Sequence, residues 1–215
     1  MDWHDWHDAY DRPDSPLARR LVAVQTQVRV ALDSAPPGPL RAISLCAGQG
    51  RDLLEVLAGH PRRDEIHARL VELDARIAEA ARARARTATL DHVEVVTGDA
   101  SLTDQYRGMA PADLVMVCGV FGNITVEDVE RTVGACRQLC QAGGTVIWTR
   151  SRDNTPDLVP LICEWFEARG FDRQWLSEPD AGFGVGAHRF RGEPQPLAAG
   201  ERMFTFIERR AQGKD

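Results

Sequence analysis

Residues 42–52, Ala-Ile-Ser-Leu-Cys-Ala-Gly-Gln-Gly-Arg-Asp, decide the fold of this chain of 215 residues. An apolar run, 42–46, ends in a turn with two glycines, and apolar residues at helical spacing follow over 52–59. Glycines in such a turn let the backbone bend sharply and approach a ligand closely. The stretch therefore predicts a strand, a turn and a helix, which together form the first unit of an α/β fold.

The same alternation of strands and helices continues along the chain. Further strands are predicted at residues 67–74, 92–97, 112–119 and 145–149. Helices are predicted at 75–86, from Thr125 to a stop at Gly143 and Gly144, and at 156–169. Strand candidates without helices between them follow at 171–176, 183–190 and 203–207. Because strands that alternate with helices pair in parallel, we predict a doubly wound, mostly parallel seven-stranded sheet with antiparallel C-terminal edge strands.

The N-terminal region differs from this repeat. Ser15 and Pro16 are typical of a helix start, and apolar residues at three- and four-residue steps continue to Leu32. A proline-rich run then ends the helix. We expect residues 1–39 to form a flap and a helical cap packed on residues 40–215, so that the chain is a single domain.

Composition and charge exclude several classes of protein. The net charge of −6 argues against a non-specific nucleic-acid binder, which needs a basic face. The longest apolar stretch is too short to span a bilayer, and the N-terminus lacks a signal-peptide pattern. Five cysteines without C-x-x-C spacing indicate neither a disulfide framework nor a zinc site. We expect a cytoplasmic monomer or homodimer without a nucleic-acid, membrane or metal partner.

Acidic residues follow the second and third predicted strands, at the sheet edge where such folds bind ligands. The second strand ends in Val-Glu-Leu-Asp74, and the third ends in Gly-Asp99-Ala100. A carboxylate at the first place can accept hydrogen bonds from ribose hydroxyls, and one at the second from an adenine amine. Leu53 stands where a dinucleotide-binding turn needs a small residue, and Asp52 lies where its pyrophosphate would sit. Both features argue against a nicotinamide cofactor.

The segments AGQG, LVELD and VVTGDA, in that order, resemble class I S-adenosylmethionine-dependent methyltransferases over residues 40–190. The segments CAGQGRD, CGVFGN and WTRSR also resemble a group of actinobacterial methyltransferase-like proteins. The resemblance implies that residues 47–50 lie under the methionine part of the cofactor, and that the main chain of 118–120 backs the sulfonium. It also implies that Asp74 holds the ribose, and that Asp99 with Ala100 holds the adenine. The candidates for cofactor binding are Tyr10, Ala47, Gly48, Gln49, Gly50, Arg51, Leu73, Asp74, Asp99, Ala100, Cys118, Gly119 and Val120.

The chain departs from the family pattern at two positions. Ser44 stands where an acid is common, and Cys46 stands where a glycine is common. Acids of the N-terminal segment, Asp5, Asp8 or Asp11, are candidates to replace the lost acid. The departures leave open a protein that binds S-adenosylmethionine or S-adenosylhomocysteine without turnover. A nicotinamide-dependent reductase is a third, disfavoured hypothesis.

The first hypothesis is in-line methyl transfer to a nitrogen, oxygen or carbon atom of a small molecule. Proximity and orientation supply most of the catalysis in such a step, and a base is needed only where the acceptor must lose a proton. The catalytic candidates are His7, Asn123, Arg150 and His188.

Each of these candidates also has a structural interpretation. Asn123 either orients substrate or caps a turn, Arg150 binds an anion or pairs with nearby acids, and His188 is a general base or a core histidine. His7 belongs to a Trp-His-Asp repeat, for which an aromatic flap is favoured over a metal site. Glu72 and Asp52 are expected to be a supporting residue and a helix N-terminal charge, respectively.

Overall fold

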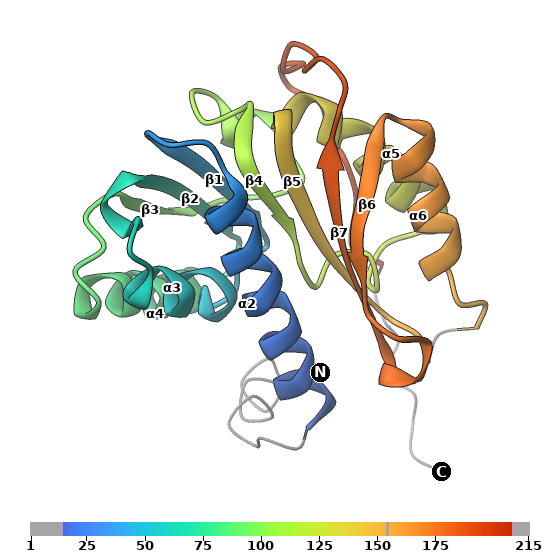
Figure 1. Ribbon diagram of the computed structural model, residues 1–215, viewed down its shortest axis with the longest axis horizontal. Coiled ribbons are helices and arrows are strands. Elements are labelled where there is room, and N and C mark those ends of the chain that lie inside the picture. Colours follow the sequence, from blue (N-terminus) through green and yellow to red (C-terminus); the bar gives the residue numbers. More distant parts are fainter. Residues whose placement is uncertain (1–14, 154, 208–215) are drawn as a thin grey trace.

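A seven-stranded sheet lies between two layers of helices in the computed structural model, which describes residues 15–153 and 155–207 (Figure 1). The strands are β1 (Leu40–Leu45), β2 (Ile66–Glu72), β3 (Val93–Thr97), β4 (Ala112–Val117), β5 (Cys140–Ser151), β6 (Phe171–Leu176) and β7 (Phe183–Phe190). Their spatial order is β3-β2-β1-β4-β5-β7-β6. Strands β1 to β5 are parallel, whereas β7 runs antiparallel to both β5 and β6. The predicted fold class is therefore confirmed.

Helices cover both faces of this sheet. They are α2 (Pro16–Ser34), α3 (Arg51–Gly59), α4 (Ala75–Thr87), α5 (Val126–Leu139) and α6 (Val159–Ala168). One apolar core joins the sheet to α2, α3 and α4, and a second joins it to α5 and α6. In β4, Leu114 and Met116 belong to the first core, and Val115 and Val117 belong to the second. Burial on both sides explains why this strand is an unbroken apolar run.

Side-chain caps start two of these helices, as their sequences predict. The Ser15 hydroxyl accepts a hydrogen bond from the Ala18 amide at 3.0 Å, and the Thr125 hydroxyl accepts one from the Asp128 amide at 3.2 Å. The Asp128 carboxylate pairs with Arg131 and accepts a hydrogen bond from the Thr205 amide. This acid therefore anchors the C-terminal segment.

The boundary between α5 and β5 corrects a prediction. The helix ends at Leu139 and the strand begins at Cys140, so Gly143 and Gly144 lie inside β5 and do not stop the helix. The register of β4 against β5 shifts here, and a Cβ at Gly144 would lie 2.9 Å from the Ala112 carbonyl oxygen. These glycines therefore mark an irregular strand that approaches its neighbour closely.

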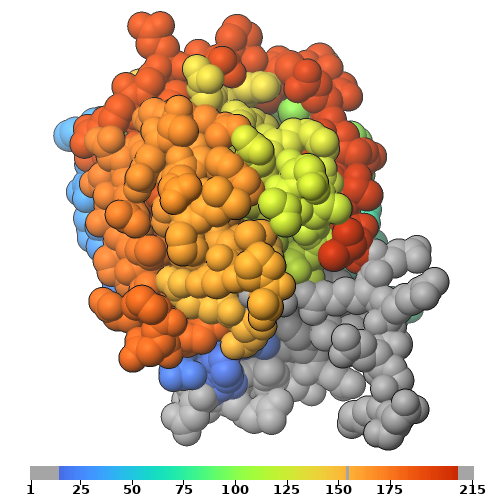
Figure 2. All heavy atoms as spheres, turned by 90° about the vertical axis from the view of Figure 1, so that its right-hand side faces the viewer, coloured from blue at the N-terminus to red at the C-terminus, as the bar shows by residue number. Residues whose placement is uncertain are grey.

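The C-terminal segment, residues 202–207, also corrects a prediction, because it adds no strand to the sheet. It makes only isolated bridges, Leu102 with Arg202 and Ile124 with Phe206. These bridges attach it to the loops after β3 and β4. Seen from the α6 side, the C-terminal segment runs beside α5 (Figure 2). It thereby reaches the carboxyl edge of the sheet.

The order of the strands reverses between β1 and β4, which are neighbours in the sheet. The chain leaves β1 in one direction, toward β2 and β3, and returns to build β4 and β5 on the other side. Ligands of open α/β sheets bind at such a switch point, outside the carboxyl ends of the strands. Among the described residues, no helix has the length and apolar character needed to cross a membrane.

Candidate functional site

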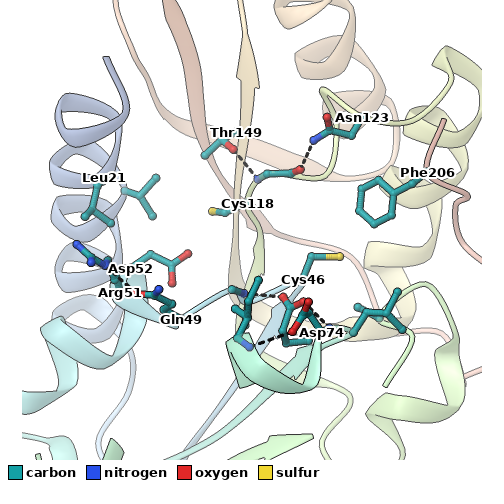
Figure 3. A pocket seen from close by; sticks show the side chains of 18 of the residues that line it. Leu21, Cys46, Gln49, Arg51, Asp52, Asp74, Cys118, Asn123, Thr149 and Phe206 are labelled. Atoms are coloured by element: carbon teal, nitrogen blue, oxygen red, sulfur yellow. Dashed lines mark hydrogen bonds between the residues drawn. The ribbon is translucent and has the colours of Figure 1, made fainter. Parts of the chain in front are cut away.

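A cavity of about 570 Å³ lies at this switch point, and its size is typical of a small-ligand site. Its walls come from α2, from the loops after β1 to β4, from the start of α3 and from the C-terminal segment (Figure 3). The predicted site residues that line it are Ala47, Gly48, Gln49, Arg51, Leu73, Asp74, Asp99, Ala100, Cys118, Gly119 and Asn123. The structure therefore brings together side chains from four separate loops.

Four of the predicted site residues that the structure describes are not part of this wall. Gly50, Val120, Arg150 and His188 do not line the cavity, and Val120 is fully buried in the core next to α5. The candidates Tyr10, His7, Asp5, Asp8 and Asp11 lie outside the described residues. Their proposed roles stay predictions.

The turn after β1 shows why its residue types are needed. Gly50 caps α3 with a φ of +68°, and a Cβ there would lie 2.7 Å from side-chain atoms of both Leu54 and Leu70. This glycine therefore serves the packing of α3 on the sheet. Cys46 has a φ of +49°, a left-handed conformation that glycine adopts without strain. The cysteine at a position where the family pattern has glycine thus strains the backbone at the cavity wall.

Glu72, at the end of β2, holds two loops together. One oxygen of its carboxylate accepts a hydrogen bond from the Gly48 amide at 2.9 Å, and the other accepts one from the Asp74 amide at 3.0 Å. Both residues line the cavity with Glu72 (Figure 3). Glu72, which the sequence predicted to be a supporting residue, therefore connects the turn after β1 to the end of β2.

Asp74 is primarily the N-cap of α4. Its Oδ1 atom accepts hydrogen bonds from the amides of Arg76 at 2.8 Å and Ile77 at 3.2 Å. An aspartate directly before a helix is a strong N-cap signal, so this role was legible in the sequence. Asp74 also lines the cavity, and its predicted role at the ribose stays a prediction.

Asp99, after β3, is held on both of its oxygens. Oδ1 accepts hydrogen bonds from the amide and the hydroxyl of Ser101, at 3.0 and 2.6 Å, and Oδ2 accepts one from Arg202 at 2.8 Å. Burial by itself raises the pKa of Asp99, but the bonds from Ser101 and Arg202 outweigh it and hold the pKa below its usual value. Asp99 is therefore an ionised acceptor in a fixed orientation.

The loop after β4 is clamped through Gly119. Its amide donates to the Thr149 hydroxyl at 2.9 Å, and its carbonyl oxygen accepts a hydrogen bond from the Asn123 side chain at 2.7 Å (Figure 3). The Asn123 carbonyl in turn accepts a hydrogen bond from the Ile207 amide at 2.9 Å. Asn123 therefore shapes the cavity wall. Thr149 and Ile207 also belong to the cavity wall, and the sequence analysis did not identify them as site residues.

Arg150 is a structural clamp at the end of β5. It is buried, and it donates a hydrogen bond to the Phe121 carbonyl oxygen. Burial lowers the pKa of its guanidinium, although nearby Asp157 raises it. Since it does not line the cavity, the structure favours the structural interpretation of Arg150 over substrate binding.

His188 is a core residue and not a base at the cavity, which corrects the catalytic prediction for it. It pairs with Val146 in the middle of β5 and not at the carboxyl edge, and it is fully buried. Its Nδ1 atom accepts a hydrogen bond from the Trp148 indole at 3.1 Å, and its ring stacks on Phe166. Burial, together with the charge of Arg173, lowers its pKa to about 3, so the ring is neutral.

Asp52 and the α2 side chains form a wall that sequence reasoning did not foresee. Asp52, the second residue of α3, and Leu21 of α2 face the cavity (Figure 3), and Arg20 and Val24 of α2 also line it. Burial raises the pKa of Asp52 to about 6, and the charge of Arg20 only partly opposes this. The only sequence signal was an acid after the glycine turn, which a helix start also explains.

Two thiols also face the cavity, those of Cys46 and Cys118. Burial raises the pKa of both far above the ordinary range, and neighbouring carboxylates add to the effect. Both thiols are therefore neutral at physiological pH and are poor nucleophiles.

Comparisons with known proteins identify the fold. No protein-family model and no curated protein matches the chain. Among solved structures, an O-methyltransferase family protein from Burkholderia thailandensis is similar, with a TM-score of 0.65 and 19% identity over 86% of this chain and 58% of that chain. The chain has the fold of class I methyltransferases. It spans less than two thirds of the length of that first relative.

Two further proteins with the methyltransferase fold were solved with a ligand bound. The 1,6-didemethyltoxoflavin-N1-methyltransferase of Burkholderia thailandensis, with its substrate and S-adenosylhomocysteine, has a TM-score of 0.62 and 16% identity over 88% of this chain and 84% of that chain. The magnesium protoporphyrin IX methyltransferase of Synechocystis PCC 6803, with S-adenosylmethionine, has a TM-score of 0.61 and 11% identity, covering 80% and 79%. Identities this low establish the fold alone.

Proposed function

We propose that the chain is an S-adenosylmethionine-dependent methyltransferase that transfers a methyl group to a nitrogen, oxygen or carbon atom of a small molecule. The observation that carries the proposal is the cavity at the switch point, with an acid at the end of each of two neighbouring strands, Glu72 after β2 and Asp99 after β3. The structural neighbours that were solved with S-adenosylmethionine or S-adenosylhomocysteine support it.

The donor and acceptor chemistry of the cavity suits an adenosine. A carboxylate has about four lone-pair sites, so Glu72 and Asp99 can accept further hydrogen bonds beyond those from the protein. In our proposal Glu72 faces the ribose hydroxyls, with Asp74 beside it, and Asp99 with Ala100 faces the adenine. The turn from Ala47 to Gly50, together with Arg51, lies next along the sheet edge and would carry the methionine part.

When bound, S-adenosylmethionine supplies a methyl group already activated on a sulfonium, so the protein chiefly needs to hold acceptor and donor in line. Main-chain groups at Cys118 and Gly119 would line the path of transfer. The clamp of Thr149 and Asn123 on Gly119 fixes that loop. The side chains of Leu21, Phe206 and Ile207 would exclude water there.

The alternative is a protein that binds the cofactor or its demethylated product without turnover. It is favoured by the loss of the acid at Ser44, whose hydroxyl is buried without a hydrogen-bond partner in the structure. Release of S-adenosylhomocysteine from S-adenosylmethionine in the presence of a panel of small acceptors would distinguish an enzyme from a binder.

The wider setting of this activity is also proposed. The acidic net charge of −6 supports a small-molecule acceptor over nucleic acid. We expect a cytoplasmic monomer or homodimer that needs no metal, in which residues 1–39 and 40–215 work as one domain. The resemblance to actinobacterial proteins stays a prediction of the sequence.

Calorimetry with S-adenosylhomocysteine tests the site. Replacement of the partly buried, hydrogen-bonding carboxylates, Glu72→Gln and Asp99→Asn, should each weaken binding by about 10- to 100-fold, corresponding to about 1–3 kcal/mol. Glu127→Gln and Asp91→Asn are matched controls, because these exposed acids lie outside the cavity and should leave the affinity unchanged. No binding by the unaltered protein, or unchanged affinity in both cavity variants, would refute the proposal. NADH should not bind.

A further inference from the structure

We propose that Asp52, with Arg20 beside it, is the subsite for the charged amino acid end of the cofactor, in which the Asp52 carboxylate accepts hydrogen bonds from the α-ammonium group. The inference rests on the proposed function and adds a binding role to a residue whose sequence suggested only a helix charge. Asp52 and Arg20 both line the cavity, from α3 and α2 respectively.

The order of the strand ends puts Asp52 beyond the places proposed for the adenine and the ribose. Strands β3, β2 and β1 are neighbours, so Asp99, Glu72 and the turn at Gly48 follow one another along the carboxyl edge. The cofactor is linear, from adenine through ribose and sulfur to the amino acid. If adenine lies at Asp99 and ribose at Glu72, the amino acid end lies beyond Gly48, near the start of α3, where Asp52 is the second residue. Figure 3 shows Asp52 and Asp74 on opposite sides of this cavity.

The electrostatics of this wall match a zwitterion. A carboxylate and a guanidinium face the same space, and the charge of Arg20 acts on Asp52. Two apolar side chains of α2, Leu21 and Val24, also line the cavity. A carboxylate in such surroundings is costly to ionise unless a cation approaches it, and an ammonium group is such a cation.

Ser44, at the position where the family pattern has an acid, supplies no carboxylate to the cavity. The family pattern places an acid at this position, but Ser44 does not line the cavity and cannot carry a charge. Asp52 lies eight residues later, after the turn, and reaches the cavity from the start of α3. The function of the lost acid would thus have moved to a neighbouring element of the same unit.

The decisive experiment compares two ligands that differ in the amino acid end. S-adenosylhomocysteine carries the ammonium and carboxylate groups, whereas 5′-deoxy-5′-methylthioadenosine carries neither. In titration calorimetry, Asp52→Asn should weaken binding of S-adenosylhomocysteine by about 10- to 100-fold and leave binding of methylthioadenosine unchanged. Retained binding of methylthioadenosine also shows that the variant is folded.

Glu55→Gln is the matched control, because it removes the same charge from the same helix but lies outside the cavity. It should leave both affinities unchanged. An equal loss for both ligands in Asp52→Asn, or no loss for either, would overturn the inference while leaving the proposed function intact. Failure of the unaltered protein to bind either ligand would instead overturn the proposed function.

The unaltered protein offers a second test that needs no variant. Decarboxylated S-adenosylhomocysteine retains the ammonium group, and the deaminated analogue retains only the carboxylate. The amine-bearing analogue should bind at least 10-fold more tightly than the deaminated one at pH 7.5. The reverse order would show that the subsite does not recognise an ammonium group, and would overturn the inference.

Discussion

Two carboxylates of the same cavity, Asp52 and Asp99, have pKa values that are shifted in opposite directions. Hydrogen bonds from Ser101 and Arg202 hold the pKa of Asp99 low despite its burial, whereas burial raises the pKa of Asp52 to about 6. The difference teaches how each end of the cavity is completed. The Asp99 end is completed by the protein itself, and the Asp52 end lacks enough compensation for its charge until a cation arrives.

The largest expected effect on stability is at His188, a buried residue outside the cavity whose pKa is also shifted. It tests whether a shifted pKa affects ligand binding only when the residue lines the cavity. His188→Ala removes a ring stacked on Phe166 and leaves the Trp148 indole N–H unpaired. We expect the free energy of unfolding to fall by about 2–4 kcal/mol at pH 7.5. Affinity for S-adenosylhomocysteine should stay unchanged, since His188 does not line the cavity.

Urea denaturation at pH 7.5 and pH 5 measures this prediction. The pKa of His188 is about 3 in the folded protein, below its ordinary value of 6.5, so the unfolded chain binds the additional proton between these values. The unaltered protein therefore loses stability as the pH falls from about 6.5 toward 3, and His188→Ala should lack that contribution. A variant of normal stability that no longer binds ligand would contradict the assignment of His188 to the core.

The second-largest expected effect is the change in the free energy of unfolding when Asp52 is replaced by Asn. The folded pKa of Asp52, about 6, lies above the ordinary value of 3.8, so the folded state holds the proton more tightly and stability falls as the pH rises between these values. Asp52→Asn should therefore be more stable than the unaltered protein by about 1–2 kcal/mol at pH 7.5. The gain should vanish below about pH 4, where Asp52 is protonated in both states.

Thermal or urea unfolding across this pH range measures the gain. The charged or titratable groups that act on Asp52 or are affected by it are Arg20 on α2, Glu55 on α3 and Cys118 after β4. Glu55→Gln should show no such gain, because Glu55 is exposed and pairs with Arg84. If Asp52→Asn were equally destabilised at all pH values, Asp52 would be a structural residue and the contrast with Asp99 would not hold.

The smallest effect is expected at the Asp99 end. Arg202→Met removes a partly exposed ion pair, so the unfolding free energy should fall by less than about 1 kcal/mol. The pKa of Asp99 should rise, and affinity for S-adenosylhomocysteine should fall a few-fold because the carboxylate is no longer held. NMR titration of the Asp99 carboxyl and calorimetry measure these changes. Arg191→Met, which breaks an exposed ion pair with Asp172, is the control. An identical pKa for Asp99 in both variants would refute this role of Arg202.

Much of the fold follows from local sequence patterns. The strand–helix units, the starts of α2 and α5 and the parallel sheet were predictable, because periodicity and capping depend on residues close together in the chain. The end of α5 was not, because Gly143 and Gly144 are also suited to a strand that closely approaches β4. Both interpretations use the same conformational freedom of glycine, and only the contact with β4 distinguishes them.

By itself, the sequence determined which strand ends face the ligand, since an acid after a parallel strand lies at the carboxyl edge in any such sheet. Only the tertiary structure decided what each acid does there. Glu72 bridges two loops while Asp74 caps a helix. Arg202 reaches Asp99 from the other end of the chain, and α2 encloses Asp52. Hydrogen bonding and burial depend on groups distant in sequence, so they arise only when the whole chain packs.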